Sequence, residues 1–336
     1  MAESSTLPDA RERPLWLRLI ARQTAVVFFV LMAIFIAFAV REPDAFFTLS
    51  NVRNMLIDAS ILLVVAVGMT FVITTAGIDL SVGSVVVFSS VVSAKLMESM
   101  GGEGWGVALA GLGLALAAGL GWGIVNGVLV AKARIPPLIV TLGTLGMALG
   151  SALLIAKGVN VRSVPLVMSV DLGIGRLWGQ IPYLVLIALA VTIAAGVALA
   201  LTRFGRYTFA IGSNQEAARR AGIDVGRHLI KVYALAGLLA GLAGWLSLAR
   251  FATTQIAGYD ALNLQAIAAV VIGGTSLFGG IGTIFGTAVG VFIPIVLQNG
   301  FVIVRVQPFW QQVAVGAVLI AAVYVDQLRR RARQRE

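Results

Sequence analysis

Long apolar runs recur along almost the whole chain, and each is close to the length that a helix needs to cross a bilayer. Such a span takes about 20 mostly apolar residues. The chain is 59% hydrophobic and 12% charged, whereas about 25% of the residues in a soluble domain are charged. The runs are too long and too uniformly apolar for barrel strands, which alternate over about ten residues. The sequence therefore predicts an all-α polytopic membrane protein.

Nine runs are clear candidate spans, and a short, glycine-interrupted tenth lies at 263–278. The nine lie at 23–40, 56–75, 84–97, 105–130, 138–156, 181–201, 230–250, 281–299 and 309–325. A total of nine would leave the very basic C-terminus on the outer face, against the positive-inside rule. Ten spans with both termini cytoplasmic place most of the 25 Lys and Arg inside. We therefore predict about ten spans, with cytoplasmic tails at 1–22 and 326–336 around one transmembrane domain at 23–325.

The remaining composition excludes several kinds of site. The chain has no cysteine, so it forms neither disulfides nor thiolate metal sites. Its one histidine, His228, falls in a basic stretch, where we expect a solvated loop position rather than a metal ligand. The net charge of +10 fits basic cytoplasmic loops better than a nucleic-acid surface. We predict no metal site and no nucleic-acid partner.

One stretch within the apolar tract, ITTAGIDLSVGS, carries a carboxylate, Asp79. A charge at a span centre costs about 2.5–3.5 kcal/mol on insertion scales, so such residues usually face the bundle interior or water. Gly77 and Gly83 flank Asp79 and Ser81, a pattern typical both of a capped helix start and of an interrupted helix beside a substrate path. The two interpretations are compatible. We expect Asp79 to accept backbone N–H groups near Ser81 and Val82.

The loop between the sixth and seventh predicted spans is the longest and most basic one. Its segment SNQEAARRAGI predicts a short helix with Asn214 or Ser213 as N-cap and Gly222 at its C-terminus. Glu216 in the first turn and Arg219 in the last match the helix dipole. A basic loop resting on anionic lipid is one interpretation. The ordered caps favour the other, a docking helix for a cytoplasmic partner.

Two further stretches depart from a plain span. The glycine-rich segment 266–290 has GxGxxG-like spacing, but no strand precedes it, so close helix crossings and a broken span are the better interpretation. Pro136 and Pro137 suit the first turn of a helix. Thr141 and Thr144 follow on that helix, and polar residues so placed either bond their own backbone or line a path.

Together these stretches resemble the permease subunit of bacterial ABC importers for monosaccharides, of the ribose/xylose/arabinose type. The resemblance is carried by TTAGIDLSVGS, NGVLVAKARIPPLIVTLGT, IGSNQEAARRAGI, AIAAVVIGGTSLFGGIGTIFGT and PFWQQVAVGAVLIAAVYVD, in the family's order over about 50–326. Permeases for branched-chain amino acids share the layout but not the wording GIDLSVGS and GGTSLFGG. The chain departs from the pattern at Asn263 and Gln265, where family members often carry an acidic pair, and it lacks an arginine common near the fifth span.

The resemblance implies a homodimer in the bacterial inner membrane, a cytoplasmic ATP-binding subunit, often with two ATPase domains in one chain, and a soluble sugar-binding protein outside. ATP and Mg would be bound by the partner, because this chain has no GxxxxGK[ST] motif, and we predict no cofactor and no catalytic residue in this chain. The loop at about 202–229 would couple to the ATPase through Asn214, Glu216, Ala217, Ala218, Arg219 and Gly222. The candidate residues of the translocation path or broken helix are Gly77, Asp79, Ser81, Gly83, Asn126, Thr141, Thr144, Gly274, Thr275 and Ser276.

Three other functions are weighed against this one. An ion-coupled secondary transporter needs ionisable residues in several spans, whereas Asp58 and Asp79 are nearly the only acids at that depth. A permease of the same superfamily for a branched-chain amino acid or a nucleoside remains an alternative. A membrane-anchored assembly protein would have no use for the capped docking helix.

Overall fold

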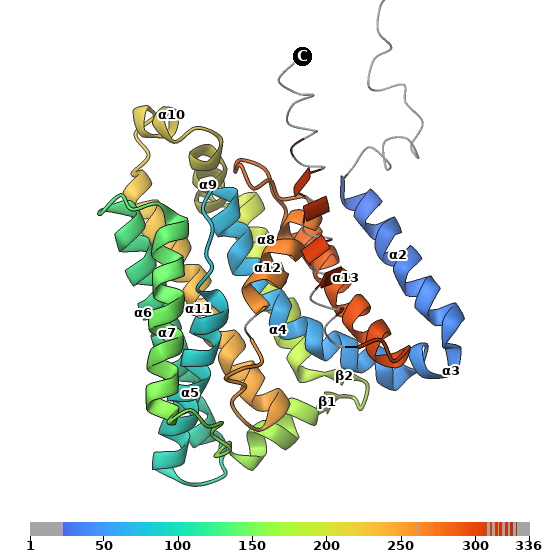
Figure 1. Ribbon diagram of the computed structural model, residues 1–336. Helices are drawn as coiled ribbons and strands as arrows, with labels where there is room; N and C mark the ends of the chain where they lie inside the picture. The colour runs from blue at the N-terminus through green and yellow to red at the C-terminus, as the bar shows by residue number, and fades with distance from the viewer. Residues whose placement is uncertain are drawn as a thin grey trace, which may run out of the picture.

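The computed structural model describes residues 23–307 except 260, together with positions 310, 313, 314, 316, 317, 320, 321, 323, 324 and 327. The chain is almost entirely helical (Figure 1). In order, its elements are α2 (Gln23–Arg41), α3 (Pro43–Phe46), α4 (Leu49–Thr74), α5 (Val82–Met100), α6 (Trp105–Ala131), α7 (Pro137–Ala156), η1 (Met168–Ile174), β1 (Arg176–Leu177), β2 (Ile181–Pro182), α8 (Tyr183–Leu201), α9 (Arg203–Ser213), α10 (Gln215–Arg220), α11 (Val225–Phe251), α12 (Leu262–Ile272) and α13 (Ile284–Ile303). The two strands form one minimal antiparallel hairpin.

Seven helices in the described part of the chain are long and apolar enough to cross a membrane: α4, α5, α6, α7, α8, α11 and α13. Two more apolar helices, in α2 and α12, are shorter. The run predicted at 309–325 and the tails at 1–22 and 326–336 lie largely or wholly outside the described residues. The helical membrane architecture is therefore confirmed, while the total of ten spans and the side on which the termini lie stay predictions.

The broken span predicted in the glycine-rich segment 266–290 is confirmed, because α12 ends at Ile272, the chain turns with positive φ at Gly274, Gly279 and Gly280, and α13 begins at Ile284. The helical part of the run at 263–278 is therefore shorter than the run itself. The loop predicted at about 202–229 contains a second helix, α9, which we did not foresee. It starts at Thr202, whose side chain accepts the N–H of Gly205. A window that averages hydropathy overlooks such a helix, because its apolar and polar residues lie on opposite faces.

The centre of the bundle is formed by α4 and α11, which lie side by side in the middle of Figure 1. Both bury most of their apolar residues within the chain, whereas α6, α7 and α8 expose most of theirs. Exposed side chains such as Leu142, Met147 and Leu154 are expected on helices that face lipid or another subunit. We call the two ends of the bundle the α10 end and the η1 end, after the elements found there (Figure 1).

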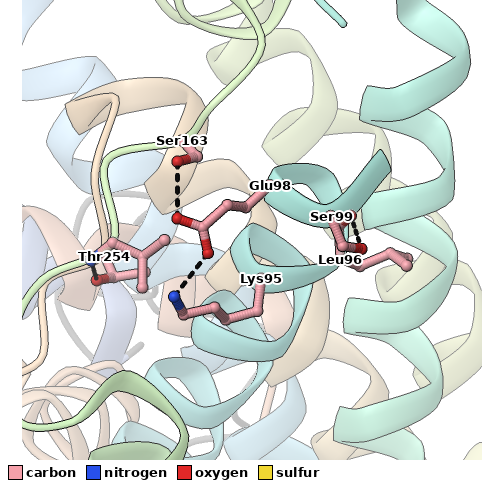
Figure 2. A network of polar contacts seen from close by, with 7 residues as sticks. Lys95, Leu96, Glu98, Ser99, Ser163 and Thr254 are labelled. Carbon is pink, nitrogen blue, oxygen red and sulfur yellow. Dashed lines mark hydrogen bonds and ion pairs between the residues drawn. The ribbon is translucent and has the colours of Figure 1, made fainter. Parts of the chain in front are cut away.

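At the η1 end, the chain that follows α7 is tied across the bundle (Figure 2). The Glu98 carboxylate, near the end of α5, accepts hydrogen bonds from Lys95 Nζ at 2.6 Å and from Ser163 Oγ at 3.1 Å. Two residues earlier, the N–H of Val161 donates to Thr254 Oγ1 at 2.8 Å. The segment 160–163 therefore connects the ends of α5 and α11 at the η1 end of the bundle.

The tightest helix contact joins α6 to α11 through facing glycines. A Cβ atom on Gly119 would overlap the carbonyl oxygen of Gly237, and a Cβ atom on Gly237 would overlap that of Gly119. Inside a membrane the hydrophobic effect does not hold helices together, so their association depends on close packing. Small residues allow this packing because they let the two backbones approach each other. The close approach of α6 and α11 therefore depends on glycine at both positions.

Gly119→Ala should destabilise the bundle, because the added methyl forces the two backbones apart. Overpacking of this kind costs about 1–3 kcal/mol, visible as a lower melting temperature of the purified protein in detergent. Gly121→Ala is the matched control on the same helix, since a Cβ there meets nothing within 4 Å. Equal melting temperatures for the two variants would contradict this account of the contact.

Candidate functional site

Two helices, α5 and α12, begin inside the bundle instead of at one of its ends. Between α4 and α5 the chain runs in non-helical form over residues 75–81, seen in Figure 1 descending from the end of α4 to about half its depth. The start of α12 lies against the start of α5, because Asn263 Nδ2 donates to the carbonyl oxygen of Leu80 at 3.1 Å. Gly83 packs there against the backbone at Tyr259. Two helix N-termini therefore meet within the protein.

A chain of buried side-chain hydrogen bonds fixes the start of α5. Asp79 Oδ1 accepts the N–H of Ser81 at 2.8 Å and the Ser81 hydroxyl at 2.6 Å. Ser81 Oγ in turn accepts from Asn126 Nδ2 on α6 at 2.8 Å, and Asn126 Oδ1 accepts from Thr144 Oγ1 on α7 at 2.7 Å. Each of the four side chains is at most 2% exposed. The chain therefore ties the interruption to two neighbouring helices.

This geometry confirms part of the expectation for Asp79. Its carboxylate is buried and binds the N–H of Ser81, as expected. Among the described residues it does not bind the N–H of Val82, the first residue of α5. Asp79 therefore closes a turn onto the N-cap residue rather than capping the helix itself.

The other predicted path residues divide into three groups. Thr141 and Thr144 bond to their own helix at Pro137 and Val140, as polar residues on apolar helices commonly do. Gly77 and Gly83 line cavities. Gly274, Thr275 and Ser276 lie in the turn that follows α12, at the α10 end, and line neither of the two cavities described below.

Two cavities flank the Asp79 chain. The first, which we call the α5–α12 cavity, has a volume of about 190 Å³ and is lined by Leu80, Gly83, Ser84, Val87, Leu145, Leu149, Tyr259 and Asn263. The second, the α10 cavity, has about 510 Å³ and reaches from Thr75–Gly77 to α10 and the first turns of α11. Its lining includes Arg134 and Arg219. Along residues 75–84, Ile78 and Asp79 lie between Gly77, which lines the α10 cavity, and Leu80, which lines the α5–α12 cavity.

Three segments meet at the α10 end in a contact that we call the glycine junction: Thr74–Ala76, Gly212–Ser213 and Gly279–Gly280. The N–H of Gly280 donates to the carbonyl oxygen of Thr74 at 2.9 Å. A Cβ on Gly212 would overlap that same oxygen and lie 2.6 Å from the nitrogen of Gly280. The end of α9 is therefore in direct backbone contact with the chain that leads into α5 and the chain that leaves α12.

The predicted docking helix exists as α10, with the caps expected from its sequence. Asn214 Oδ1 accepts the N–H of Ala217 at 2.9 Å. At the other end Gly222 adopts φ +82°, and the N–H of Ile223 donates to the carbonyl oxygen of Ala218 at 3.1 Å, which is a Schellman motif. Glu216 is well exposed and pairs with Arg219 and Arg220. The helix is rigid at both ends and presents a charged face.

The prediction for His228 was wrong. The residue lies in the first turn of α11, is 6% exposed, and its Nε2 lies 2.9 Å from Thr208 Oγ1 of α9. Its ring also packs against Phe204. His228 therefore fastens α9 to α11, because α9, which the sequence reading missed, covers it. Within the described residues no cluster of potential metal ligands occurs.

Asn126→Leu should lower the stability of the fold. The leucine removes the acceptor of Thr144 and the donor to Ser81, and an unpaired buried polar group costs about 1–3 kcal/mol. The measurement is the melting temperature of the purified protein in detergent. Ser99→Ala, which changes an exposed serine bonded only to its own helix, is the control. A variant as stable as that control would show that the buried chain contributes nothing.

Known proteins match this chain over the same stretches that form the site. Residues 51–323 match the family described as "Branched-chain amino acid transport system / permease component". The ribose import permease protein RbsC of Escherichia coli strain K12 is 39% identical over 315 residues, which cover 92% of this chain and 94% of that protein. The fructose import permease protein FrcC of Rhizobium meliloti is 35% identical over 90% of this chain and 85% of its own length. No solved structure matched.

A further relative, the galactose/methyl galactoside import permease protein MglC of Escherichia coli strain K12, is 34% identical over 90% of this chain and 93% of its own. The family match spans both interrupted helices, the buried Asp79 chain and α10. This chain therefore belongs to the branched-chain amino acid transport system / permease component family.

Proposed function

We propose that this chain is the transmembrane permease subunit of an ABC importer that moves a monosaccharide, a pentose or hexose, inward across the bacterial inner membrane. The observation that carries the proposal is that relatives matched over about nine-tenths of the chain are import permeases for ribose, fructose, allose and galactose. The family description is broader and names branched-chain amino acids. A branched-chain amino acid or nucleoside is therefore the second candidate substrate, and the sugar relatives favour the first.

The proposed assembly contains two copies of this chain, a cytoplasmic ATP-binding subunit with tandem ATPase domains, and a soluble sugar-binding protein on the outer side. ATP and Mg are bound by the ATPase, and this chain carries neither. It crosses the membrane ten times with both termini in the cytoplasm, so that α10 faces the ATPase. The basic last turn of α10, with Arg219 and Arg220, supports this orientation, because positive charge collects in cytoplasmic loops.

In the proposed mechanism α10 receives the movement of the ATPase. Its N-cap Asn214 directly follows Gly212 and Ser213, so the movement reaches the glycine junction within three residues. From there it passes to residues 75–81 and 273–283, which are the connections of α5 and α12. Displacing these connections would move Asp79, which lies between the linings of the two cavities along the chain, and would so open or close a path between them. No covalent step occurs in this chain.

The direct test is sugar uptake by the permease reconstituted in liposomes with its ATPase and binding protein. Ribose, fructose, allose, galactose and leucine are compared, with ATP inside the vesicle or absent. The proposal expects ATP-dependent uptake of at least one monosaccharide and none from the permease alone. Uptake of leucine and of no sugar would overturn it in favour of the second candidate. ATP hydrolysis by the purified permease alone would contradict the proposal that the partner subunit is the ATPase.

Glu216→Lys should abolish uptake and leave the protein folded. The two ion pairs of Glu216 are solvent-exposed, and exposed pairs of this kind contribute only about 0.2–1 kcal/mol. A reversed charge on the face of α10 would instead disturb docking. Uptake and co-purification with the ATPase are the measurements.

Glu42→Lys is the control for this variant, because it reverses an exposed acid near α3, away from α10. Normal uptake by Glu216→Lys would refute the docking role of α10. Loss of uptake in both variants would show that charge reversal acts in some way other than through docking.

A further inference from the structure

The α5–α12 cavity lies where the two interrupted helices begin. Ser84 is the third residue of α5 and Asn263 the second of α12, while Leu145 and Leu149 lie near the middle of α7. A position midway along the spans, beside the ends of discontinuous helices, is where membrane transporters commonly place a substrate. The position alone does not identify a ligand. The class of ligand follows from the chemistry of the residues that line the cavity.

Several polar groups at this cavity lack a partner. The hydroxyl of Ser84 makes no hydrogen bond within the described residues, although the residue is only 7% exposed. The main-chain N–H groups of Gly83 and Ser84 are likewise unpaired there, because residues in the first turn of a helix have no intrahelical acceptor. Donors without a protein partner at the wall of a cavity are satisfied by water or by a ligand with oxygen acceptors. The cavity therefore suits an occupant that supplies such acceptors.

The rest of the lining restricts what that occupant is. Asn263 adds an amide whose Nδ2 donates to the carbonyl oxygen of Leu80 and whose Oδ1 accepts the N–H of Leu264, so that its orientation is fixed. Each of the two atoms has the capacity for one more hydrogen bond. Tyr259 is held by a 2.7 Å hydrogen bond from its hydroxyl to Ser247 Oγ. Leu145 and Leu149 supply an apolar wall. This mixture suits a ring with hydroxyl groups at its edge and C–H groups on its face.

Charge and size narrow the choice further. None of the described lining residues is charged, so the cavity offers no counter-ion to the ammonium and carboxylate of an amino acid or to a phosphate ester. Its volume of about 190 Å³ is room for about six waters. That volume is comparable to that of one monosaccharide in water and is smaller than that of a disaccharide.

We propose that the α5–α12 cavity is a binding site for one neutral monosaccharide within the permease itself. Sugar hydroxyls bond to Ser84, to the N–H groups at the start of α5 and to Asn263, and Tyr259 packs against the ring. The inference rests on the proposed function, since it places that function's substrate in this chain. It adds that the permease, in addition to the external binding protein, discriminates by charge and size.

The first test is direct binding to the full-length permease in lipid nanodiscs, without the binding protein. Saturation-transfer NMR is recorded with galactose, ribose, galactose 6-phosphate and leucine at millimolar concentration. The proposal expects transfer to at least one free sugar and none to the phosphate ester or to leucine. Saturation transfer to the sugar should be lost in the Ser84→Val and Asn263→Leu variants. It should be retained in Ser90→Ala. Ser90 lies on the same helix, is buried and bonds to Val87, but does not line the cavity.

The second test is uptake by the assembled transporter carrying the same variants. Ser84→Val replaces the hydroxyl by methyl groups, so uptake should fall about tenfold or more, as expected for the loss of at least one buried hydrogen bond. ATP hydrolysis stimulated by the binding protein should stay within about twofold, because α10 is untouched. If Ser84→Val does not assemble, Ser84→Ala replaces it, since it only removes the hydroxyl.

The outcomes separate the inference from the proposed function. In one outcome the wild-type protein takes up a sugar, and the Ser84 and Asn263 variants show unchanged uptake and NMR transfer. This outcome refutes the binding site and leaves the proposed importer function standing. The same is true if the wild-type nanodisc shows no transfer to any sugar, which would mean that the cavity holds water only. Failure of the wild-type assembly to move any monosaccharide overturns the proposed function, and the site with it.

Discussion

A polypeptide inside a membrane has to satisfy every backbone hydrogen bond within the protein. The structure meets part of this requirement at two turns, one before α5 inside the bundle and one after α12 at the α10 end. Before α5, Asp79 accepts the N–H of Ser81, and Asn263 donates to the carbonyl oxygen of Leu80. After α12, the N–H of Gly280 donates to the carbonyl oxygen of Thr74. Polar residues are therefore concentrated at the interruptions, because the exposed backbone there has to be paired.

The same requirement links the two interruptions to each other and to α9. A backbone oxygen such as that of Thr74 can be reached only if the neighbouring chain carries no side chain at the point of contact. Gly212 and Gly280 meet this condition, since a Cβ on Gly212 would overlap the oxygen. Three segments that are far apart in the sequence therefore form one rigid contact. The proposal that a displacement of α10 also moves the connections of α5 and α12 rests on this contact.

The sequence was sufficient for the helical membrane architecture, for α10 with its caps, and for the burial of Asp79. These features depend on local patterns: an apolar run, an Asn three residues before a helical N–H, a glycine after a helix. It was not sufficient for α9 or for the environment of His228. An amphipathic helix has an average hydropathy close to that of a loop, and the partner of His228, Thr208, lies 20 residues away.

The cavities could not be foreseen either, for the same kind of reason. Ser84 and Tyr259 line one volume only because α5 and α12 start side by side, and no spacing in the sequence encodes that meeting. The motif GIDLSVGS drew attention to Asp79, while Leu80, Gly83 and Ser84 of the same motif line the α5–α12 cavity. The sequence motif indicated the region of the site, and the packing of α5 against α12 determines which side chains line the cavity.

The most direct test of this account follows amide hydrogen exchange in the assembled transporter in nanodiscs, without nucleotide and with a non-hydrolysable ATP analogue. The account predicts that exchange changes together in α10, in residues 75–81 and in residues 273–283. In Gly212→Ala, whose added methyl group disrupts the junction, α10 should still respond and both connections should stop responding. A wild-type protein in which α10 responds to nucleotide and the two connections do not would contradict the claim that the glycine junction transmits the movement.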